Sequence, residues 1–130
     1  MHDMVDASQK RILLVEDEPA IARAMADKLT TEGFTVLRAS DGEEGLALAT
    51  KEHPDVILLD VVMPKMDGMT MLTNLRKDAW GKEAKVIFLT NLSEMEAVQK
   101  ATELGVFDYI VKSDWKLSDV VKKVREKLGM

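Results

Sequence analysis

Four short, mostly apolar runs of this sequence each end on a polar side chain that could take part in chemistry. The runs and the residues that follow them are 12–15 with Glu16 and Asp17, 56–59 with Asp60, 86–89 with Thr90, and 108–111 with Lys112. Three carboxylates, a hydroxyl and an ammonium group are therefore candidates for a common site.

These side chains suit phosphoryl chemistry. Carboxylates that lie close together repel each other unless a cation neutralises them. Hard oxygen ligands favour Mg²⁺, which typically binds through one or two carboxylates together with a phosphoryl group. The ammonium group of Lys112 can hold one phosphoryl oxygen, and the hydroxyl of Thr90 can donate a hydrogen bond to another. Such a setting suits an aspartyl-phosphate intermediate, for which Asp60 is the candidate nucleophile.

Strand-like and helix-like segments alternate along the chain. Short β-prone runs predict strands at 11–17, 34–39, 55–60, 84–90 and 107–112. Helical spacing and Ser-x-x-Glu capping patterns at 40–43 and 93–96 predict helices at about 19–33, 40–51, 68–77, from 93 onward, and 115–128. The pattern predicts an α/β fold, a doubly wound five-stranded parallel sheet with helices on both faces. Ligands bind such sheets outside the carboxyl ends of the strands, where the candidate residues lie.

Composition restricts the class of protein. The 130 residues, 46% hydrophobic and 32% charged, predict one globular domain at 10–130 after a flexible tail at 1–9. A net charge of −5 argues against a dominant electrostatic grip on nucleic acid or an anionic membrane. The absence of cysteine excludes disulfides and thiol catalysis, and no apolar run approaches the ~18 residues of a membrane span. We therefore expect a cytoplasmic protein.

Four stretches together resemble a known family. They are ILLVEDE at 12–18, ILLDVVMPKMDG at 57–68, IFLTN at 87–91 and DYIVK at 108–112. In this order they resemble the receiver domain of two-component response regulators over about residues 10–128, in a form like the single-domain chemotaxis regulators. The resemblance implies the flavodoxin-like strand order 2-1-3-4-5.

The resemblance also implies roles for the site residues. Asp60 would accept a phosphoryl group from a histidine kinase or a phosphotransfer protein in a Mg²⁺-dependent reaction. Asp17 would be the direct metal ligand, with Glu16 nearby or acting through water. Asp60 and the backbone carbonyl of Val62 would complete the protein's share of the metal site.

The remaining implied roles concern the response to phosphorylation. Lys112 would hold the phosphoryl group, and Thr90 and Tyr109 would form the switch pair. A downstream protein would then bind the face formed by helix four, strand five and helix five, or the domain would form a phosphorylation-dependent homodimer. The domain would catalyse only its own phosphorylation and dephosphorylation, and would contact neither nucleic acid nor a membrane directly.

One departure from the family concerns the residue after Lys112. The family usually has proline there, often in a cis peptide, whereas this chain has Ser113. A non-proline cis bond costs about 2.5–4 kcal/mol. The Lys112–Ser113 peptide is therefore predicted to be trans.

Other interpretations remain open from the sequence. Asp60 alone could be a turn residue, and Tyr109 could be ordinary packing. A pseudo-receiver that is never phosphorylated could act as a scaffold for protein binding. An aspartate-based phosphatase typically needs a second aspartate two residues after the nucleophile, where this chain has Val62. Val62 and Leu92, each two residues beyond Asp60 or Thr90, cannot orient a hydrolytic water, which predicts a long-lived phosphorylated state.

Overall fold

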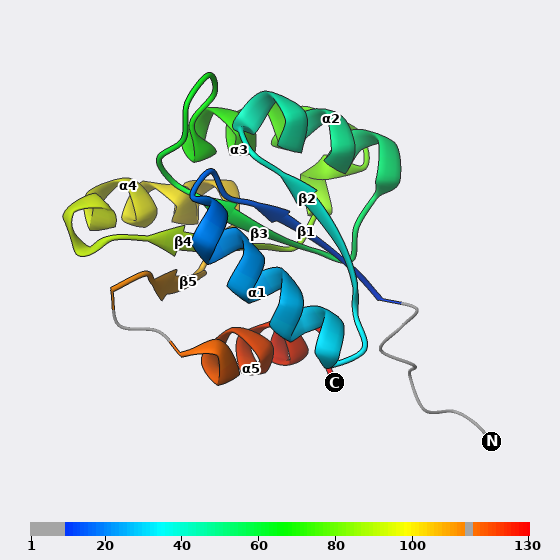
Figure 1. Cartoon of the computed structure of the whole chain (residues 1–130). Helices are drawn as coiled ribbons and strands as arrows, with labels where there is room; N and C mark the ends of the chain where they lie inside the picture. Colours follow the sequence, from blue (N-terminus) through cyan, green and yellow to red (C-terminus); the bar gives the residue numbers. More distant parts are fainter. Residues whose placement is uncertain (1–9, 114–115) are drawn as a thin grey trace.

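A computed structural model, which describes residues 10–113 and 116–130, contains one parallel sheet of five strands (Figure 1). The strands are β1 Arg11–Val15, β2 Thr35–Ala39, β3 Val56–Asp60, β4 Val86–Thr90 and β5 Asp108–Val111. Their order is β2-β1-β3-β4-β5, as predicted. The expected tail at 1–9 and position 115, the predicted start of the last helix, lie outside the described residues.

Five α-helices connect and follow the strands. They are α1 Pro19–Thr31, α2 Gly42–Glu52, α3 Gly68–Arg76, α4 Met95–Lys100 and α5 Leu117–Leu128. In the described part of the chain, three short 3₁₀ helices accompany them: η2 Gly81–Glu83, η3 Leu92–Glu94 and η4 Ala101–Leu104. Within the described ranges, no helix is long and apolar enough to cross a membrane.

Helices cover both faces of the sheet (Figure 1). Side chains alternate between the two faces along each strand, so the central strands supply both halves of the core. On one face, Leu13, Ile57 and Phe88 pack with buried residues of α2, α3 and α4. On the other face, Leu14 and Leu58 pack with buried residues of α1 and α5. The strands β3 and β4 are buried along their whole length, which explains their nearly unbroken apolar sequence.

The starts of two helices differ from the predicted capping patterns. Helix α2 is capped by Asp41, whose Oδ1 accepts a hydrogen bond from Glu44 N at 2.8 Å, so the cap lies one residue after Ser40. The predicted cap at Ser93 is wrong, because Ser93 lies inside η3. The chain turns earlier there, and the Glu94 carboxylate accepts a hydrogen bond from Asn91 N at 3.0 Å.

The loop between β3 and α3 is held by two close backbone contacts. A Cβ atom on Gly42 would lie 2.0 Å from Met66 O, and one on Gly68 would lie 2.3 Å from Asp60 O. Only glycine allows such approaches without a shift of the backbone.

The Lys112–Ser113 peptide is trans, as predicted, and no described peptide bond is cis.

Candidate functional site

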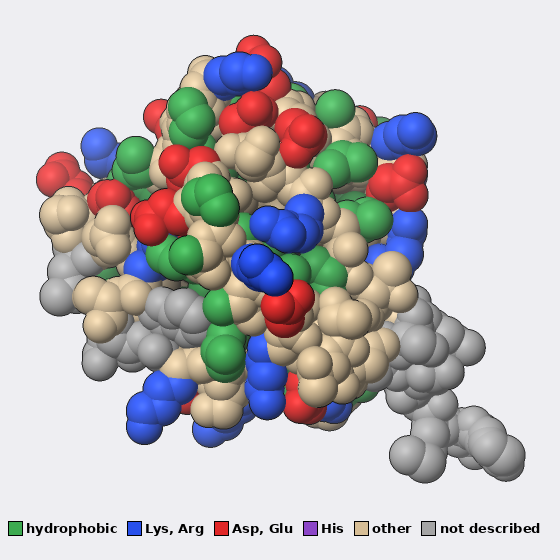
Figure 2. Space-filling model, in the orientation of Figure 1, with side chains coloured by type: hydrophobic (Ala, Val, Ile, Leu, Met, Phe, Trp, Pro, Cys, Tyr) green, Lys and Arg blue, Asp and Glu red, His purple; other side chains and the backbone are tan. Residues whose placement is uncertain are grey.

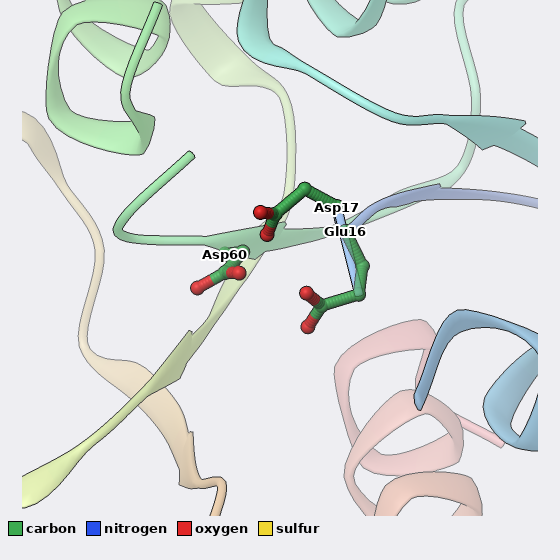
Figure 3. Close-up of side chains that lie close together, drawn as sticks. All are labelled: Glu16, Asp17 and Asp60. Carbon is green, nitrogen blue, oxygen red and sulfur yellow. The ribbon is translucent and has the colours of Figure 1, made fainter. Parts of the chain in front are cut away.

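Three carboxylates gather at the carboxyl edge of the sheet. Because β1 and β3 are neighbours, with Val15 paired to Leu59, the residues that end these strands lie side by side. Carboxylate oxygens of Glu16, Asp17 and Asp60 all lie within 4.8 Å of one another (Figure 3). The predicted meeting of the strand ends is therefore present in the fold.

Two of these carboxylates are removed from water. Glu16 and Asp60 are each 2% exposed, whereas Asp17 is only half-buried. Burial of Asp60, together with the neighbouring Glu16 carboxylate, raises the pKa of Asp60 to about 8, although Lys112 acts in the opposite direction. The arrangement thus concentrates negative charge where solvent cannot screen it.

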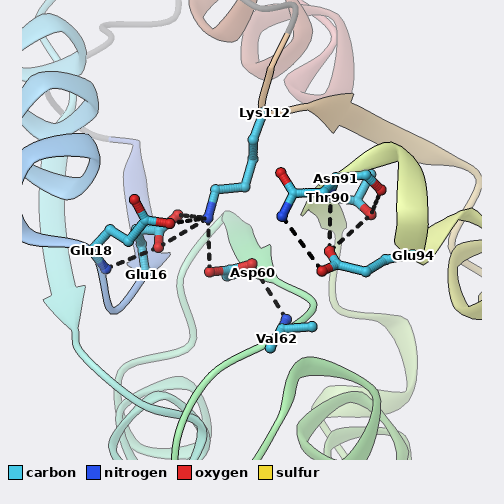
Figure 4. A network of polar contacts seen from close by, with 8 residues as sticks. All are labelled: Glu16, Glu18, Asp60, Val62, Thr90, Asn91, Glu94 and Lys112. Carbon is cyan, nitrogen blue, oxygen red and sulfur yellow. Dashed lines mark hydrogen bonds and ion pairs between the residues drawn. The ribbon is translucent and has the colours of Figure 1, made fainter.

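Lys112 follows the edge strand β5, two strands away from β3, and its side chain brings a positive charge into the cluster. Its Nζ lies 3.0 Å from Glu16 Oε1, 3.1 Å from Asp60 Oδ2 and 3.3 Å from Glu18 Oε1 (Figure 4). Burial lowers the pKa of Lys112, but the hydrogen bonds and charges of Glu16 and Asp60 outweigh burial, and the net shift is upward. Lys112 therefore stays cationic among three carboxylates.

The cluster fits a divalent cation. Glu16 Oε1 is shut off from solvent and accepts no hydrogen bond, even though an ion-pair contact with Lys112 lies close by. One lysine leaves most of the negative charge of Glu16, Asp17 and Asp60 uncompensated. An all-oxygen set of this kind suits Mg²⁺. These residues could hold a metal ion.

Val62 lies directly beyond this cluster. Its backbone N–H is 3.4 Å from Asp60 Oδ1, and the residue is 56% exposed. The assignment of its carbonyl to the metal remains a prediction. For Leu92, the other position expected to influence hydrolysis, the side chain lies outside what the structure describes.

Thr90 ends β4 beside the cluster but is bonded to other partners. Thr90 is fully buried, and its hydroxyl donates a hydrogen bond to Asn91 O at 3.0 Å. Register pairs Thr90 with Val111, and Tyr109 lies two residues before Val111, so Thr90 and Tyr109 point to the same face of the sheet. Tyr109 is 39% exposed on that face.

Two contacting residues were missed by the sequence analysis. Glu18 ends the stretch ILLVEDE and was given no role, yet it contacts Lys112. Glu94 contacts Thr90 and Asn91. A signal for Glu94 is present in the sequence, because Asn91-x-x-Glu94 has the spacing of a capping box and overlaps the pattern at 93–96.

The family model of the response regulator receiver domain matches residues 12–125. The chain belongs to this family. Curated relatives agree: the probable transcriptional regulator ycf27 of Porphyridium aerugineum is 39% identical over 104 residues, which make up 80% of this chain and 42% of ycf27. The DNA-binding dual master transcriptional regulator RpaA of Synechocystis sp. is 35% identical over 115 residues, 88% of this chain and 47% of RpaA. The receiver domain thus spans less than half the length of these relatives.

Solved structures show the same fold. The chemotaxis protein CheY4 of Vibrio cholerae superposes with a TM-score of 0.84 and 29% identity over 92% of this chain and 98% of CheY4. The receiver domain of the sensor histidine kinase PA1611 of Pseudomonas aeruginosa superposes with a TM-score of 0.83 and 26% identity over 93% of this chain and 98% of that domain. The PA1611 domain holds a magnesium ion in its active site cleft.

Proposed function

We propose that this receiver domain is a phosphorylation switch in two-component signalling, in which Asp60 accepts a phosphoryl group from a phosphohistidine. The observation that carries the proposal is the buried Asp60 carboxylate, which lies within ion-pair distance of Lys112 and close to the Glu16 and Asp17 carboxylates. The donor would be a histidine kinase or a phosphotransfer protein. A small phosphodonor would serve the same reaction in vitro.

The transfer forms one bond and breaks one bond. An oxygen of Asp60 attacks the phosphorus, the phosphorus–nitrogen bond breaks, and its electron pair returns to the donor's histidine ring, which takes up a proton from water. The ammonium group of Lys112 is close enough to move from the Asp60 oxygen to a phosphoryl oxygen. Thr90 would donate its hydroxyl hydrogen bond to another phosphoryl oxygen.

Mg²⁺ is part of the proposal. Asp17, Asp60 and the carbonyl of Val62 would hold it, with Glu16 nearby or acting through water. When bound, the ion would neutralise the clustered carboxylates and the incoming phosphoryl group. Asp60 must be ionised to act as a nucleophile, whereas burial raises its pKa and favours the protonated form. A neighbouring cation would favour the ionised form.

The output would be a changed protein surface. Thr90 and Tyr109 lie on the face of the sheet against which α4 packs, so a movement of Thr90 toward Asp60 would leave space for Tyr109 to repack. The face formed by α4, β5 and α5 would then gain affinity for a downstream protein or for a second copy of this chain. The domain would catalyse only its own phosphorylation and dephosphorylation.

We place the domain in the cytoplasm and expect no direct contact with nucleic acid. Its net charge is −5, and acidic and basic side chains are interspersed over the face that Figure 2 shows. RpaA is a DNA-binding regulator, but this chain matches less than half of its length, so we do not propose DNA binding for this chain.

The test is the incorporation of a phosphoryl group at one residue. Wild-type chain is incubated with acetyl phosphate and Mg²⁺, and the intact mass is measured. One phosphoryl group should be added, none in EDTA, and none in Asp60→Asn; Asp17→Asn should also stay unlabelled. Glu96→Gln, which removes an exposed carboxylate from α4, should be labelled like the wild type. Labelling of Asp60→Asn would show that another residue accepts the phosphoryl group, and an unlabelled wild type would favour the pseudo-receiver scaffold instead.

A further inference from the structure

A second group of polar contacts lies beside the phosphorylation site and includes Glu94. The Thr90 hydroxyl donates to Asn91 O at 3.0 Å and lies 3.5 Å from Glu94 Oε1. Glu94 Oε1 also accepts from Asn91 N at 3.0 Å, and Glu94 Oε2 lies 3.5 Å from Asn91 Nδ2 (Figure 4). One carboxylate therefore contacts Thr90 and both nitrogen donors of Asn91.

This group is separate from the cluster around Lys112. In Figure 4, the contacts of Asp60 run to Lys112 and to the backbone of Val62, and those of Thr90 run to Asn91 and Glu94. Among the described residues, no hydrogen bond joins Thr90 to Asp60. The hydroxyl proton that a phosphoryl group on Asp60 would need is thus engaged elsewhere.

We propose that Glu94 is a positioning residue that holds the Thr90 hydroxyl away from Asp60 and so opposes the phosphorylated state. This inference rests on the proposed function of Asp60. The single proton of the Thr90 hydroxyl is donated to Asn91 O at 3.0 Å, and the charged Glu94 Oε1 is a second acceptor at 3.5 Å. Glu94 also fixes Asn91 by accepting its N–H at 3.0 Å. A phosphoryl group must compete with this pair of acceptors before Thr90 can turn toward it.

The contacts also link Thr90 to the start of α4. Glu94 ends η3, and its own backbone N–H donates to Asn91 O at 3.0 Å, the same oxygen that accepts from Thr90. Departure of the Thr90 hydroxyl removes one bond from this oxygen and one partner from Glu94. Because Asn91 is exposed, water can donate to the oxygen that the Thr90 hydroxyl leaves. The release therefore loosens the turn that leads into α4 without burying an unpaired group.

A purely structural role for Glu94 makes a different prediction. If Glu94 only capped the turn before α4, its removal would lower stability and would not depend on the Thr90 hydroxyl. If Glu94 holds the hydroxyl back, its removal should favour binding of a phosphoryl mimic, and only while Thr90 has a hydroxyl to donate. The two roles are separated by a double-mutant cycle.

The experiment measures the affinity for beryllofluoride, a mimic of the phosphoryl group, by calorimetry in saturating Mg²⁺. Glu94→Ala should bind it about 2- to 10-fold more tightly than the wild type, the range expected for removal of one competing hydrogen bond. Glu94→Gln keeps the shape of the side chain with a weaker, uncharged acceptor and should show a smaller gain. It also tests the inference if the alanine variant is poorly folded.

Two comparisons isolate the mechanism. Glu96→Ala removes the same charge two residues away, at an exposed side chain with no hydrogen bond or ion pair among the described residues, and should leave the affinity nearly unchanged. In a Thr90→Val background, Glu94→Ala should bring no gain. A gain that Glu96→Ala reproduces, a gain that persists without the Thr90 hydroxyl, or no gain at all would overturn the inference. A wild type that does not bind beryllofluoride would instead overturn the proposed function.

Discussion

Asp60 is held in a position that is unfavourable for a negative charge in the metal-free protein. Its carboxylate is buried next to two others, and its pKa is raised from 3.8 to about 8. Active sites commonly contain such unfavourable charge arrangements, and neutral substitutions there often stabilise the fold.

We expect Asp60→Asn to raise the free energy of unfolding of the metal-free protein by about 1–3 kcal/mol at neutral pH. The gain should depend on pH with a definite sign. The unfolded chain loses the Asp60 proton near pH 4 and the folded chain near pH 8, so wild-type stability falls as pH rises between about 4 and 8. The advantage of the asparagine variant should therefore be small at the acid end of this interval and largest at its alkaline end. Urea denaturation in EDTA measures it.

Mg²⁺ provides the control for this prediction. A cation that binds the folded wild type stabilises it by mass action, and Asp60→Asn has lost one proposed ligand. Added Mg²⁺ should therefore narrow the difference between the two proteins. A variant that is less stable than the wild type in EDTA would show that the Asp60–Lys112 ion pair, and not carboxylate repulsion, dominates the metal-free site.

Val62 should control how long the phosphorylated state lasts. It is 56% exposed beside Asp60 and lines a groove of about 590 Å³ with residues of α4, including Ala97. An apolar side chain there cannot hydrogen-bond a water in line with the phosphorus. Val62→Asn should shorten the lifetime of the acyl phosphate several-fold, measured as decay of the phosphorylated mass in Mg²⁺. Val62→Ala is the matched control. If both variants accelerate the decay of the acyl phosphate equally, the lifetime depends on the access of water to the site and not on a hydrogen bond that orients the water.

At the scale of elements, the loop between β3 and α3 is held in place by contacts with the start of α2. Met66 O lies against Gly42, and Lys65 Nζ is 3.7 Å from Asp41 Oδ2, which belongs to the residue that caps α2. The loop also contains Val62, whose carbonyl is a proposed metal ligand. The position of α2 should therefore influence the metal site.

Gly42→Ala should displace this loop, because the new Cβ would lie 2.0 Å from Met66 O, a backbone atom that cannot rotate away. We expect a loss of about 1–3 kcal/mol in unfolding free energy and several-fold weaker Mg²⁺ binding by titration. Gly45→Ala is the control: its Cβ would meet side-chain atoms of Val15 and Met71 in the core. Gly45→Ala should lose stability but keep its Mg²⁺ affinity. Equal Mg²⁺ affinities for the wild type and Gly42→Ala would contradict an influence of α2 on the metal site.

At the scale of the whole molecule, the proposed switch requires that phosphorylation at one edge of the sheet changes the face formed by α4, β5 and α5. Tyr109 is the only tyrosine of the chain and is 39% exposed on β5, so its accessibility reports on this face without interference. Beryllofluoride with Mg²⁺ should slow the nitration of Tyr109 by tetranitromethane, because the ring repacks inward. In Asp60→Asn the rate should not respond. An unchanged rate in a wild type that binds beryllofluoride would show that Tyr109 is not part of the switch.

The sequence by itself determined the features that depend on neighbours along the chain. Short β-prone runs, helical spacing and capping patterns predicted the five described strands and five described α-helices, and the polar residues after four of the runs marked the candidate site. Errors were local as well: the turn before α4 was misread because the patterns at 91–94 and 93–96 overlap, and spacing alone cannot rank two competing caps.

Only the tertiary structure decided which partners these side chains have. Lys112 and Glu16 are 96 positions apart and meet because β5 and β1 end at the same edge of one sheet. The sequence could place Thr90 at that edge, but its hydroxyl could bond in several directions, and packing of the turn after β4 directs it to Asn91 and Glu94. Spacing along the chain defines where a side chain is attached, whereas the direction of its hydrogen bonds depends on atoms supplied by other segments of the fold.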